Sequence, residues 1–358
     1  MAGETAYLTT GNQWFAGFGG VGVQPAKGFF RQPWRTQRPV RHTLGQMAYR
    51  LERGESVIAG LKRIAQDEIE SAGAQLSGDR RGRDKAIHEA RKSIKKVRAL
   101  LRLVSAELGG VYPRENARLR DIAGVLSAFR DDVVIIETFD DLKRKFRKET
   151  RNRLRPVRAA LTKTKNETGR AEVVGIVLDH AVAALGNVAK RVADWPLETD
   201  GFPALGPGLE KTYRAGRSAL TCVRKDPRPD SYHELRKRVK DHWYHIRLLE
   251  NLWTSVMIAY EKSLKDLETW LGDDHNLAVL REKIVAEPAL YGEQKDIDLI
   301  LDLIDKYQQE LRDRSLSLAE RIYEEKPSVF IHRMNHLWDT WRQEPKILEQ
   351  SSARATHV

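Results

Sequence analysis

The chain has 358 residues, of which 62 are Lys or Arg and 50 are Asp or Glu, giving a formal net charge of +12. It is long enough for one large or two ordinary domains, and it contains no run of about 18 apolar residues, so no membrane insertion is predicted. The single cysteine, Cys222, excludes an intrachain disulfide and a thiolate cluster. The first residues lack the features of a secretory signal, so we expect an intracellular protein.

Residues 1–43 differ from the rest of the chain because glycines alternate with aromatic side chains, as at Gly17, Phe18 and Gly19. Clustered glycine disfavours a regular helix because ordering it loses much backbone entropy. This segment is therefore predicted to be an irregular arm.

From about residue 44, apolar residues recur at spacings of three and four, which is typical of amphipathic helices and predicts an all-α protein. The Pro- and Gly-rich stretch 195–208 favours a boundary between a first helical half, 44–194, and a second, 195–344, and residues 345–358 are expected to be a disordered tail. The expected helices are 55–77, 83–108, 114–127, 130–165, 170–193, 205–224, 230–254, 257–271, 274–287, 293–325 and 329–343.

The two halves share an internal repeat. Residues 87–103 align without a gap on 232–248, and residues 126–134 align on 271–279, both at an offset of 145 residues. A chance match would not keep its register over the intervening positions. The sequence therefore predicts two homologous helical-bundle halves related by a pseudo-twofold axis.

The repeated segment places its cations along one side of a helix, which we call the basic stripe. At about 100° per residue these side chains fall within about 120° of arc, beside an apolar face that includes Ile87, Ile94 and Leu101. The first stripe consists of His88, Arg91, Lys92, Lys95, Arg98 and Arg102. The second consists of His233, Arg236, Lys237, Lys240 and Arg247, with Trp243 in place of Arg98 and Tyr244 beside it.

A solvated helix face is the alternative interpretation of such a stripe. However, solvated faces usually mix charges, whereas between Arg81 and Arg102 there are nine Lys or Arg residues against two acids, Asp84 and Glu89. Repulsion among these cations would be relieved by an anion. Two such helices facing each other would line a basic central cavity or channel.

Several other residues leave alternatives open. His88 and His233 suit either a phosphate contact or a structural hydrogen bond, and no metal ligand spacing accompanies them. Asp273, Asp274 and His275 are consecutive, so they would point about 100° apart on a helix and are interpreted as a helix N-terminal cluster rather than a hydrolase site. Trp243 and Tyr244 are expected to pack at the cavity edge rather than to serve as stacking platforms.

Three segments together resemble the CHAD family, the conserved histidine α-helical domain, over about residues 50–342. They are H-E-A-R-K-x-x-K-K-x-R at 88–98, L-S-A-F-R-D-D-V at 126–133 and H-E-L-R-K-R-V-K-D at 233–241, with G-L-E-K-T-Y-R-A-G-R at 208–217 between them. The resemblance implies two four-helix halves around a positively charged cavity that binds inorganic polyphosphate, without catalysis or cofactor. The residues it implies for binding are His88, Arg91, Lys92, Lys95, Arg98, Arg130, Tyr213, Arg214, Arg217, His233, Arg236, Lys237, Lys240 and Arg247.

The sequence departs from the family pattern in places. Trp243 interrupts the second stripe, and His275 with Asn276 stands where the first half has Arg130 with Asp131. The arm at 1–43 lies outside the pattern, and the E-x-E-x-K motif of triphosphate-processing domains, which often accompany this family, is absent.

We therefore expect a non-enzymatic polyphosphate-binding protein, cytoplasmic or associated with polyphosphate-rich bodies, to which binding would target it. Nucleic-acid binding through the same basic surface is the alternative, although no base-reading or stacking fingerprint is found. A phosphoanhydride-cleaving enzyme would need a metal-binding carboxylate cluster or a nucleophile with its base, and neither can be assembled from the sequence.

Overall fold

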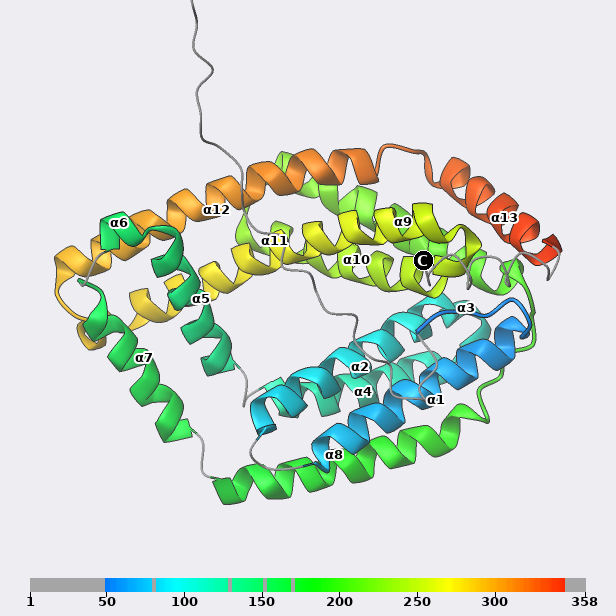
Figure 1. The fold of residues 1–358 in the computed structure, drawn as a ribbon, viewed down its shortest axis with the longest axis horizontal. Helices are drawn as coiled ribbons and strands as arrows, with labels where there is room; N and C mark the ends of the chain where they lie inside the picture. The colour runs from blue at the N-terminus through cyan, green and yellow to red at the C-terminus, as the bar shows by residue number, and fades with distance from the viewer. Residues whose placement is uncertain (1–48, 79–81, 128–130, 151–152, 169–170, 345–358) are drawn as a thin grey trace, which may run out of the picture. The chain divides into compact units, whose positions relative to one another are not determined.

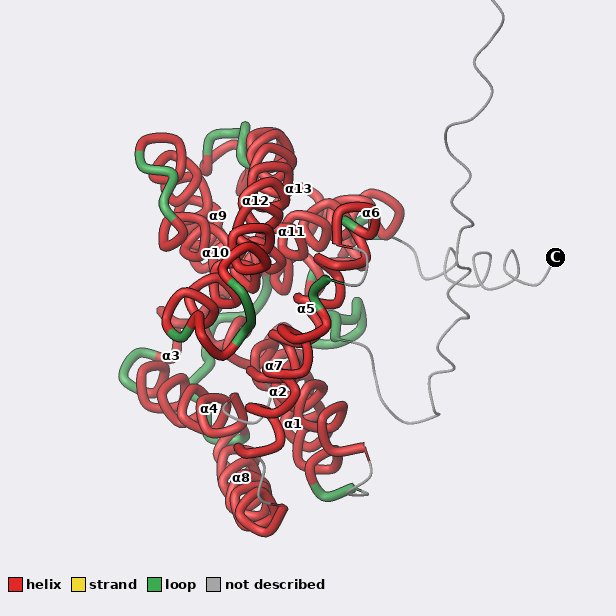
Figure 2. The backbone as a smooth tube through the Cα atoms, turned by 90° about the vertical axis from the view of Figure 1, so that its left-hand side faces the viewer, coloured by secondary structure: helices red, strands yellow, loops and turns green. Residues whose placement is uncertain are grey.

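The computed structural model describes residues 49–78, 82–127, 131–150, 153–168 and 171–344. Every regular element in these ranges is helical, as Figure 2 shows, so the all-α prediction is confirmed. The predicted arm, Arg130 and the predicted tail lie outside the described residues. None of the described helices combines the length and apolar character that crossing a membrane requires.

The helices of the first part of the chain are α1 (Val57–Leu76), α2 (Arg83–Leu103), α3 (Ser105–Leu108), α4 (Val111–Ser127), α5 (Asp131–Lys145), α6 (Arg147–Thr150), α7 (Arg155–Thr168) and α8 (Ala171–Val192). The second part has α9 (Phe202–Lys225), α10 (Pro229–Leu248), η2 (Glu250–Leu252), α11 (Thr254–Ala286), η3 (Pro288–Leu290), α12 (Gln294–Ile322) and α13 (Pro327–Gln343). In Figure 1, α1, α2, α4 and α8 run side by side, and α9 to α13 form the neighbouring group.

The bounds differ from expectation in several places. The helix expected over 83–108 is divided into α2 and α3, and the one expected over 130–165 into α5, α6 and α7. The helix expected over 230–254 is α10 followed by η2, whereas the two helices expected over 257–287 are one continuous helix, α11. At the Pro- and Gly-rich stretch, α9 already begins at Phe202 and continues through Pro207.

Packing explains why the Gly-rich segment is helical. A Cβ at Gly208 would lie 1.7 Å from the carbonyl oxygen of Leu103, so only glycine lets α9 rest on the C-terminal end of α2. Gly201, with φ of 72°, makes the turn that starts α9, and Pro203 occupies its first turn, where no N–H is required.

The buried apolar side chains form two clusters, and both clusters draw on both predicted halves. The larger cluster joins α1, α2, α4 and α8 to α9, α10, α13 and the first part of α11. The smaller cluster joins α5 and α7 to the second part of α11 and the first part of α12. The division of the chain at residues 194 and 195 stays a prediction.

The helix bounds follow the repeat offset in part. Helix α9 begins 145 residues after α1 begins, and α10 ends 145 residues after α2 ends. However, α11 spans positions that in the first part are shared between α4 and α5. The pseudo-twofold relation between the halves stays a prediction.

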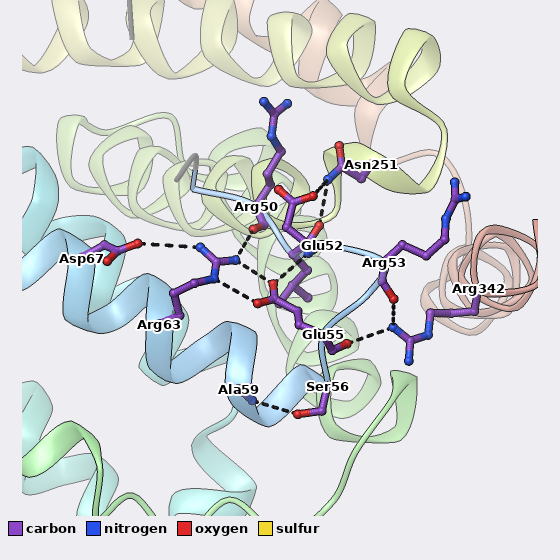
Figure 3. A network of polar contacts seen from close by, with 11 residues as sticks. Arg50, Glu52, Arg53, Glu55, Ser56, Ala59, Arg63, Asp67, Asn251 and Arg342 are labelled. Atoms are coloured by element: carbon purple, nitrogen blue, oxygen red, sulfur yellow. Dashed lines mark hydrogen bonds and ion pairs between the residues drawn. The ribbon is translucent and has the colours of Figure 1, made fainter. Parts of the chain in front are cut away.

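A polar network holds the segment before α1 against three other elements (Figure 3). The backbone N–H of Leu51 donates to the carbonyl of Leu248 at 2.9 Å, and the amide of Asn251 donates to the carbonyl of Leu51 at 2.8 Å. From α13, Arg342 donates to the carbonyl of Glu55 at 3.0 Å. The start of α1 is therefore fixed to α10, η2 and α13.

Candidate functional site: a cavity lined by basic side chains

Helices α2 and α10 both turn their basic stripes toward one cavity. The apolar face predicted for α2 is buried, with Ile87, Ile94 and Leu101 each at most 1% exposed. With that face buried, the adjoining cationic side of α2 lines the cavity together with residues of α10, and the two helices pack against each other. His245 of α10 reinforces this contact, since its Nε2 lies 2.9 Å from the carbonyl oxygen of Ala99 in α2.

The main cavity has a volume of about 650 Å³ and lies between α2, α5, α10 and α11. Seven Lys or Arg side chains line it against three acids, so its wall carries a net positive charge even with the histidines neutral. The cations are Arg91, Lys92, Lys95, Arg236, Lys240, Arg247 and Lys265; the acids are Glu137, Glu268 and Asp273; the histidines are His88 and His275. An excess of fixed cations in a partly enclosed space favours an anionic ligand.

A smaller cavity of about 190 Å³ adjoins the main cavity, because Lys95, Lys240 and Tyr244 line both. It receives the remaining cations of the stripes, Arg98, Arg102 and Lys237, together with Arg238 and Asp241. Lys95 and Lys240 therefore stand between the two cavities.

On α10 the cations are held by a buried carboxylate from α11. Glu268, which is 4% exposed, accepts from Lys240 at 2.7 Å and from Lys265 at 2.8 Å, and its Oε1 lies 3.5 Å from Nη2 of Arg236. Burial raises the pKa of this carboxyl, but the charges of Lys240, Lys265 and Arg236 outweigh burial and lower the pKa to about 2. Glu268 is thus a charged group inside the cationic wall.

On α2, by contrast, Lys95 has no hydrogen-bond or ion-pair partner among the described residues. Burial, together with the neighbouring charges of Lys240, Arg91 and Arg236, lowers the pKa of Lys95 to about 7. An anion placed in the cavity beside Lys95 would oppose both effects and favour the charged form of this lysine.

Comparison with known proteins identifies the family and the fold. A family model described as the CHAD domain matches residues 63–285, which is more than half of the chain. The chain belongs to the CHAD family. A crystal structure of the CHAD domain from the plant Ricinus communis is similar in fold, with a TM-score of 0.58 at 17% identity over 80% of this chain and 98% of that one. A comparison with curated proteins found no match.

The CHAD domain brings together most of the stripe residues, and several of them are held by hydrogen bonds or ion pairs to other residues of the domain. Arg91 donates to the carbonyl of Ala123 at 2.8 Å, Arg102 pairs with Asp241 at 2.8 Å, and Arg98 donates to Asn116 at 3.0 Å. Two pairs lie within the stripes' own helices, Lys92 with Glu89 at 2.8 Å and Lys237 with Glu234 at 2.5 Å. Arg247 pairs with Glu261 of α11 at 3.0 Å.

The two stripe histidines differ in position. His88 lines the main cavity, whereas His233 does not, and its ring instead packs on that of His275 with the centroids 4.1 Å apart. Burial and the charges of Lys237 and Arg236 lower the pKa of His233. Among the described residues no group of three or more His, Cys, Asp or Glu side chains is arranged to hold a metal ion.

Three residues implied by the family resemblance lie elsewhere in the CHAD domain. Tyr213 is fully buried and stacked on Phe330, and its hydroxyl lies 3.2 Å from the carbonyl oxygens of Ile322 and Glu325. Arg217 also donates to backbone carbonyls at this end of α12, and Arg214 pairs with Glu210 on the surface of α9. Because this side of α9 faces the connection between α12 and α13, these three residues do not line the cavity.

The acidic and aromatic residues need one correction. Asp273, Asp274 and His275 point in different directions, since Asp273 lines the cavity while Asp274 pairs with Arg312 of α12 at 2.8 Å. They lie in the middle of α11, however, so the interpretation as a helix N-terminal cluster was wrong. Trp243 and Tyr244 are buried at the cavity edge and stacked on each other, with centroids 4.8 Å apart.

The wall contributed by α11 was missed by sequence analysis, apart from Asp273, His275 and Asn276. Its other members Lys265, Glu268, Thr269 and Gly272 recur at spacings of three and four, which is the pattern of one helix face. Gly272 matters sterically, because a Cβ there would lie 3.2 Å from Nη2 of Arg236. This wall was missed because two separate helices, 257–271 and 274–287, were expected where α11 is continuous.

Proposed function

We propose that the cavity between α2 and α10 binds inorganic polyphosphate and that this chain is a binding protein rather than an enzyme. The observation that carries the proposal is the excess of Lys and Arg around the main cavity, supplied by α2, α10 and α11, with α10 packed against both of the others. Rows of cations fixed on packed helices lose less conformational freedom on binding than a mobile basic tail would lose.

Polyphosphate suits this wall because its charge repeats along a thin chain that carries no base or sugar. A cavity of about 650 Å³ lies within the range of roughly 300–1,000 Å³ that takes small ligands, so several phosphate units fit at once. Arginine binds two phosphate oxygens through its planar fork, and lysine supplies a movable point charge. A long chain would also reach the smaller cavity past Lys95 and Lys240, in the manner of a channel.

Nucleic acid is the second candidate, since its phosphates would gain from the same cations. Nonspecific binding of single strands usually relies on exposed aromatic faces, on which the bases stack. Here the Trp243 ring is stacked on Tyr244 and has the ammonium of Lys265 at 4.7 Å, so the aromatic faces at the cavity are already engaged. This favours a ligand without bases.

The test is a calorimetric titration of the full chain with long-chain polyphosphate at two salt concentrations. We expect saturable binding that weakens steeply as salt rises, because bound phosphates release counterions. A competition with labelled polyphosphate separates the two candidates. If duplex DNA or RNA displaced the label at equal phosphate concentration, the preference for polyphosphate would be refuted.

The same preparation tests the absence of catalysis. Incubation of triphosphate or polyphosphate with the protein and magnesium should release no orthophosphate above the protein-free control, and turnover would overturn this part of the proposal. Binding of polyphosphate would also place the chain at polyphosphate-rich bodies in the cell, which imaging of a tagged full chain checks.

A further inference from the structure

Glu268 is an unexpected group for an anion-binding wall. Its carboxylate is almost completely buried, and both of its oxygens accept from ammonium groups that line the cavity, Lys240 at 2.7 Å and Lys265 at 2.8 Å. The guanidinium of Arg236 approaches the same carboxylate at 3.5 Å. These N–H donors are the type of group that a phosphate oxygen would use.

The first half has no counterpart to this carboxylate. At the repeat offset of 145 residues, Glu268 corresponds to Ala123, which contributes only its backbone carbonyl to Arg91. Lys95, which corresponds to Lys240, has no ion-pair partner among the described residues. The lysine of the α2 stripe that corresponds to Lys240 is therefore present without a paired carboxylate, so the acid on α11 calls for a separate explanation.

We propose that Glu268 is an internal competitor of phosphate that makes the cavity selective for long polyphosphate over orthophosphate and other small anions. This inference rests on the proposed polyphosphate-binding function. The carboxylate of Glu268 accepts from Lys240 and Lys265 and lies near Arg236, which are cations that a small anion would need. A phosphate that binds there must share those cations and also lie close to a like charge.

The preference for long chains follows from how the repulsion by Glu268 compares with the number of favourable phosphate contacts. Repulsion from one carboxylate is a local and fixed term, whereas favourable contacts increase with the number of phosphate units that reach other cations. A long chain can also place units against Arg98 and Arg102 in the smaller cavity, which Glu268 does not line, while a single phosphate has no such additional contacts. The carboxylate of Glu268 therefore weakens the binding of small anions proportionally more than the binding of long chains.

A purely positioning role for Glu268 predicts the opposite result. If the carboxylate served only to hold Lys240 and Arg236 in place, its neutralisation would leave mutually repelling cations less ordered and would weaken the binding of every phosphate. The sign of the change in affinity therefore distinguishes the two roles.

The experiment compares Glu268→Gln with the wild-type full chain by calorimetry, using orthophosphate, triphosphate and long-chain polyphosphate. We expect the affinity for triphosphate to rise about tenfold, which corresponds to about 1.4 kcal/mol, and the affinity for long chains to rise less. The ratio of long-chain to triphosphate affinity should fall. Unchanged or weakened binding of triphosphate by folded Glu268→Gln would overturn the inference.

A matched control is available in Glu115 of α4. It is 2% exposed and pairs with Arg191 at 2.9 Å, but it does not line either cavity described above. Glu115→Gln should leave all three affinities at the wild-type level. An equal gain from Glu115→Gln would show a general charge effect and would also overturn the inference.

A second variant covers the case in which Glu268→Gln does not fold, as judged by thermal melting. Asn276→Asp adds a carboxylate of nearly the same size to the cavity wall and should raise the ratio of long-chain to triphosphate affinity. A fall in that ratio would contradict selection by a wall carboxylate. If the wild-type chain binds no long-chain polyphosphate, the proposed function fails, whereas binding without the expected variant effects refutes only this inference.

Discussion

Helices α2 and α10 carry nearly the same series of cations, yet the surroundings of these cations differ. On α10, Lys240 and Arg236 face the buried carboxylate of Glu268, and Arg247 faces Glu261. On α2, the corresponding Lys95 has no partner among the described residues and its pKa is lowered to about 7. The two repeated segments are similar in sequence, but Lys95 and Lys240 lie in different electrostatic environments.

The difference arises from the helix that stands opposite each stripe. Helix α11 is continuous and presents carboxylates to α10, whereas the corresponding first-half residues belong to α4 and α5 and offer carbonyl and hydroxyl oxygens to Arg91. Paired cations are held in position before any ligand arrives, and the unpaired lysine gains most from a ligand. A polyphosphate chain would therefore meet cations that are mostly held in position on both helices, with Lys95 as the unpaired lysine among the described residues.

The largest effect is expected from removing one lysine of each wall. Lys95→Ala combined with Lys240→Ala should weaken long-chain polyphosphate binding about 100-fold in calorimetry, because each charge-assisted contact contributes about 1.5–3 kcal/mol at most. The control combines Lys211→Ala with Lys306→Ala, two exposed lysines outside both cavities. Equal losses from the two pairs would mean that binding reflects diffuse charge and not these walls.

Replacing each lysine singly should change the free energy of unfolding in opposite directions when no polyphosphate is added. Lys95→Met removes a partly buried cation that has no partner in the described part of the chain, and should raise the free energy of unfolding by about 1 kcal/mol. Lys240→Met deprives Glu268 of its partner at 2.7 Å and should lower that free energy by about 1 kcal/mol. Urea unfolding without polyphosphate measures both values. Changes of the same sign would show that the pairing difference does not govern stability.

The pH dependence sharpens the same comparison. Because the pKa of Lys95 is about 7 in the folded chain against 10.5 ordinarily, the unfolded chain binds more protons between these values. The contribution of Lys95 to the free energy of unfolding therefore rises with pH across this window. The charged neighbours that act on Lys95 are Arg91 of α2, Lys240 and Arg236 of α10 and Glu268 of α11.

Polyphosphate should raise the pKa of Lys95 again, so binding at pH 8 should be coupled to the uptake of up to about one proton. Titrations in buffers of different ionisation enthalpy measure this number directly. Lys95→Met should reduce the uptake, and an unchanged value would assign the proton to another group.

The smallest effects are expected at the residues of α9. Tyr213→Phe should lower the free energy of unfolding by about 1 kcal/mol, since it removes the hydroxyl from two backbone carbonyls, and should leave polyphosphate affinity within twofold. Arg214→Ala should change neither quantity, because its partner Glu210 lies on the same exposed surface. A marked loss of binding in Arg214→Ala would extend the site to α9.

Sequence periodicity predicted the all-α class and the orientation of α2, because burial of Ile87, Ile94 and Leu101 is a property of one helix. It did not predict the wall formed by α11, because which face of that helix meets α10 is decided by tertiary packing. Arg217, which the family motif implied for binding, donates to backbone carbonyls at the end of α12, so its part in ligand binding stays a prediction.

The contact between Gly208 and the backbone of Leu103 has a consequence for how this domain can vary. Helix α9 touches the main chain of α2 there, and α10 packs along α9, so the gap between the two cationic helices is set by atoms that no substitution can shorten. Larger residues at position 208 would force the helices apart. Side chains that line the cavity can therefore change without moving the backbones of α2 and α9 at this contact, whereas position 208 cannot.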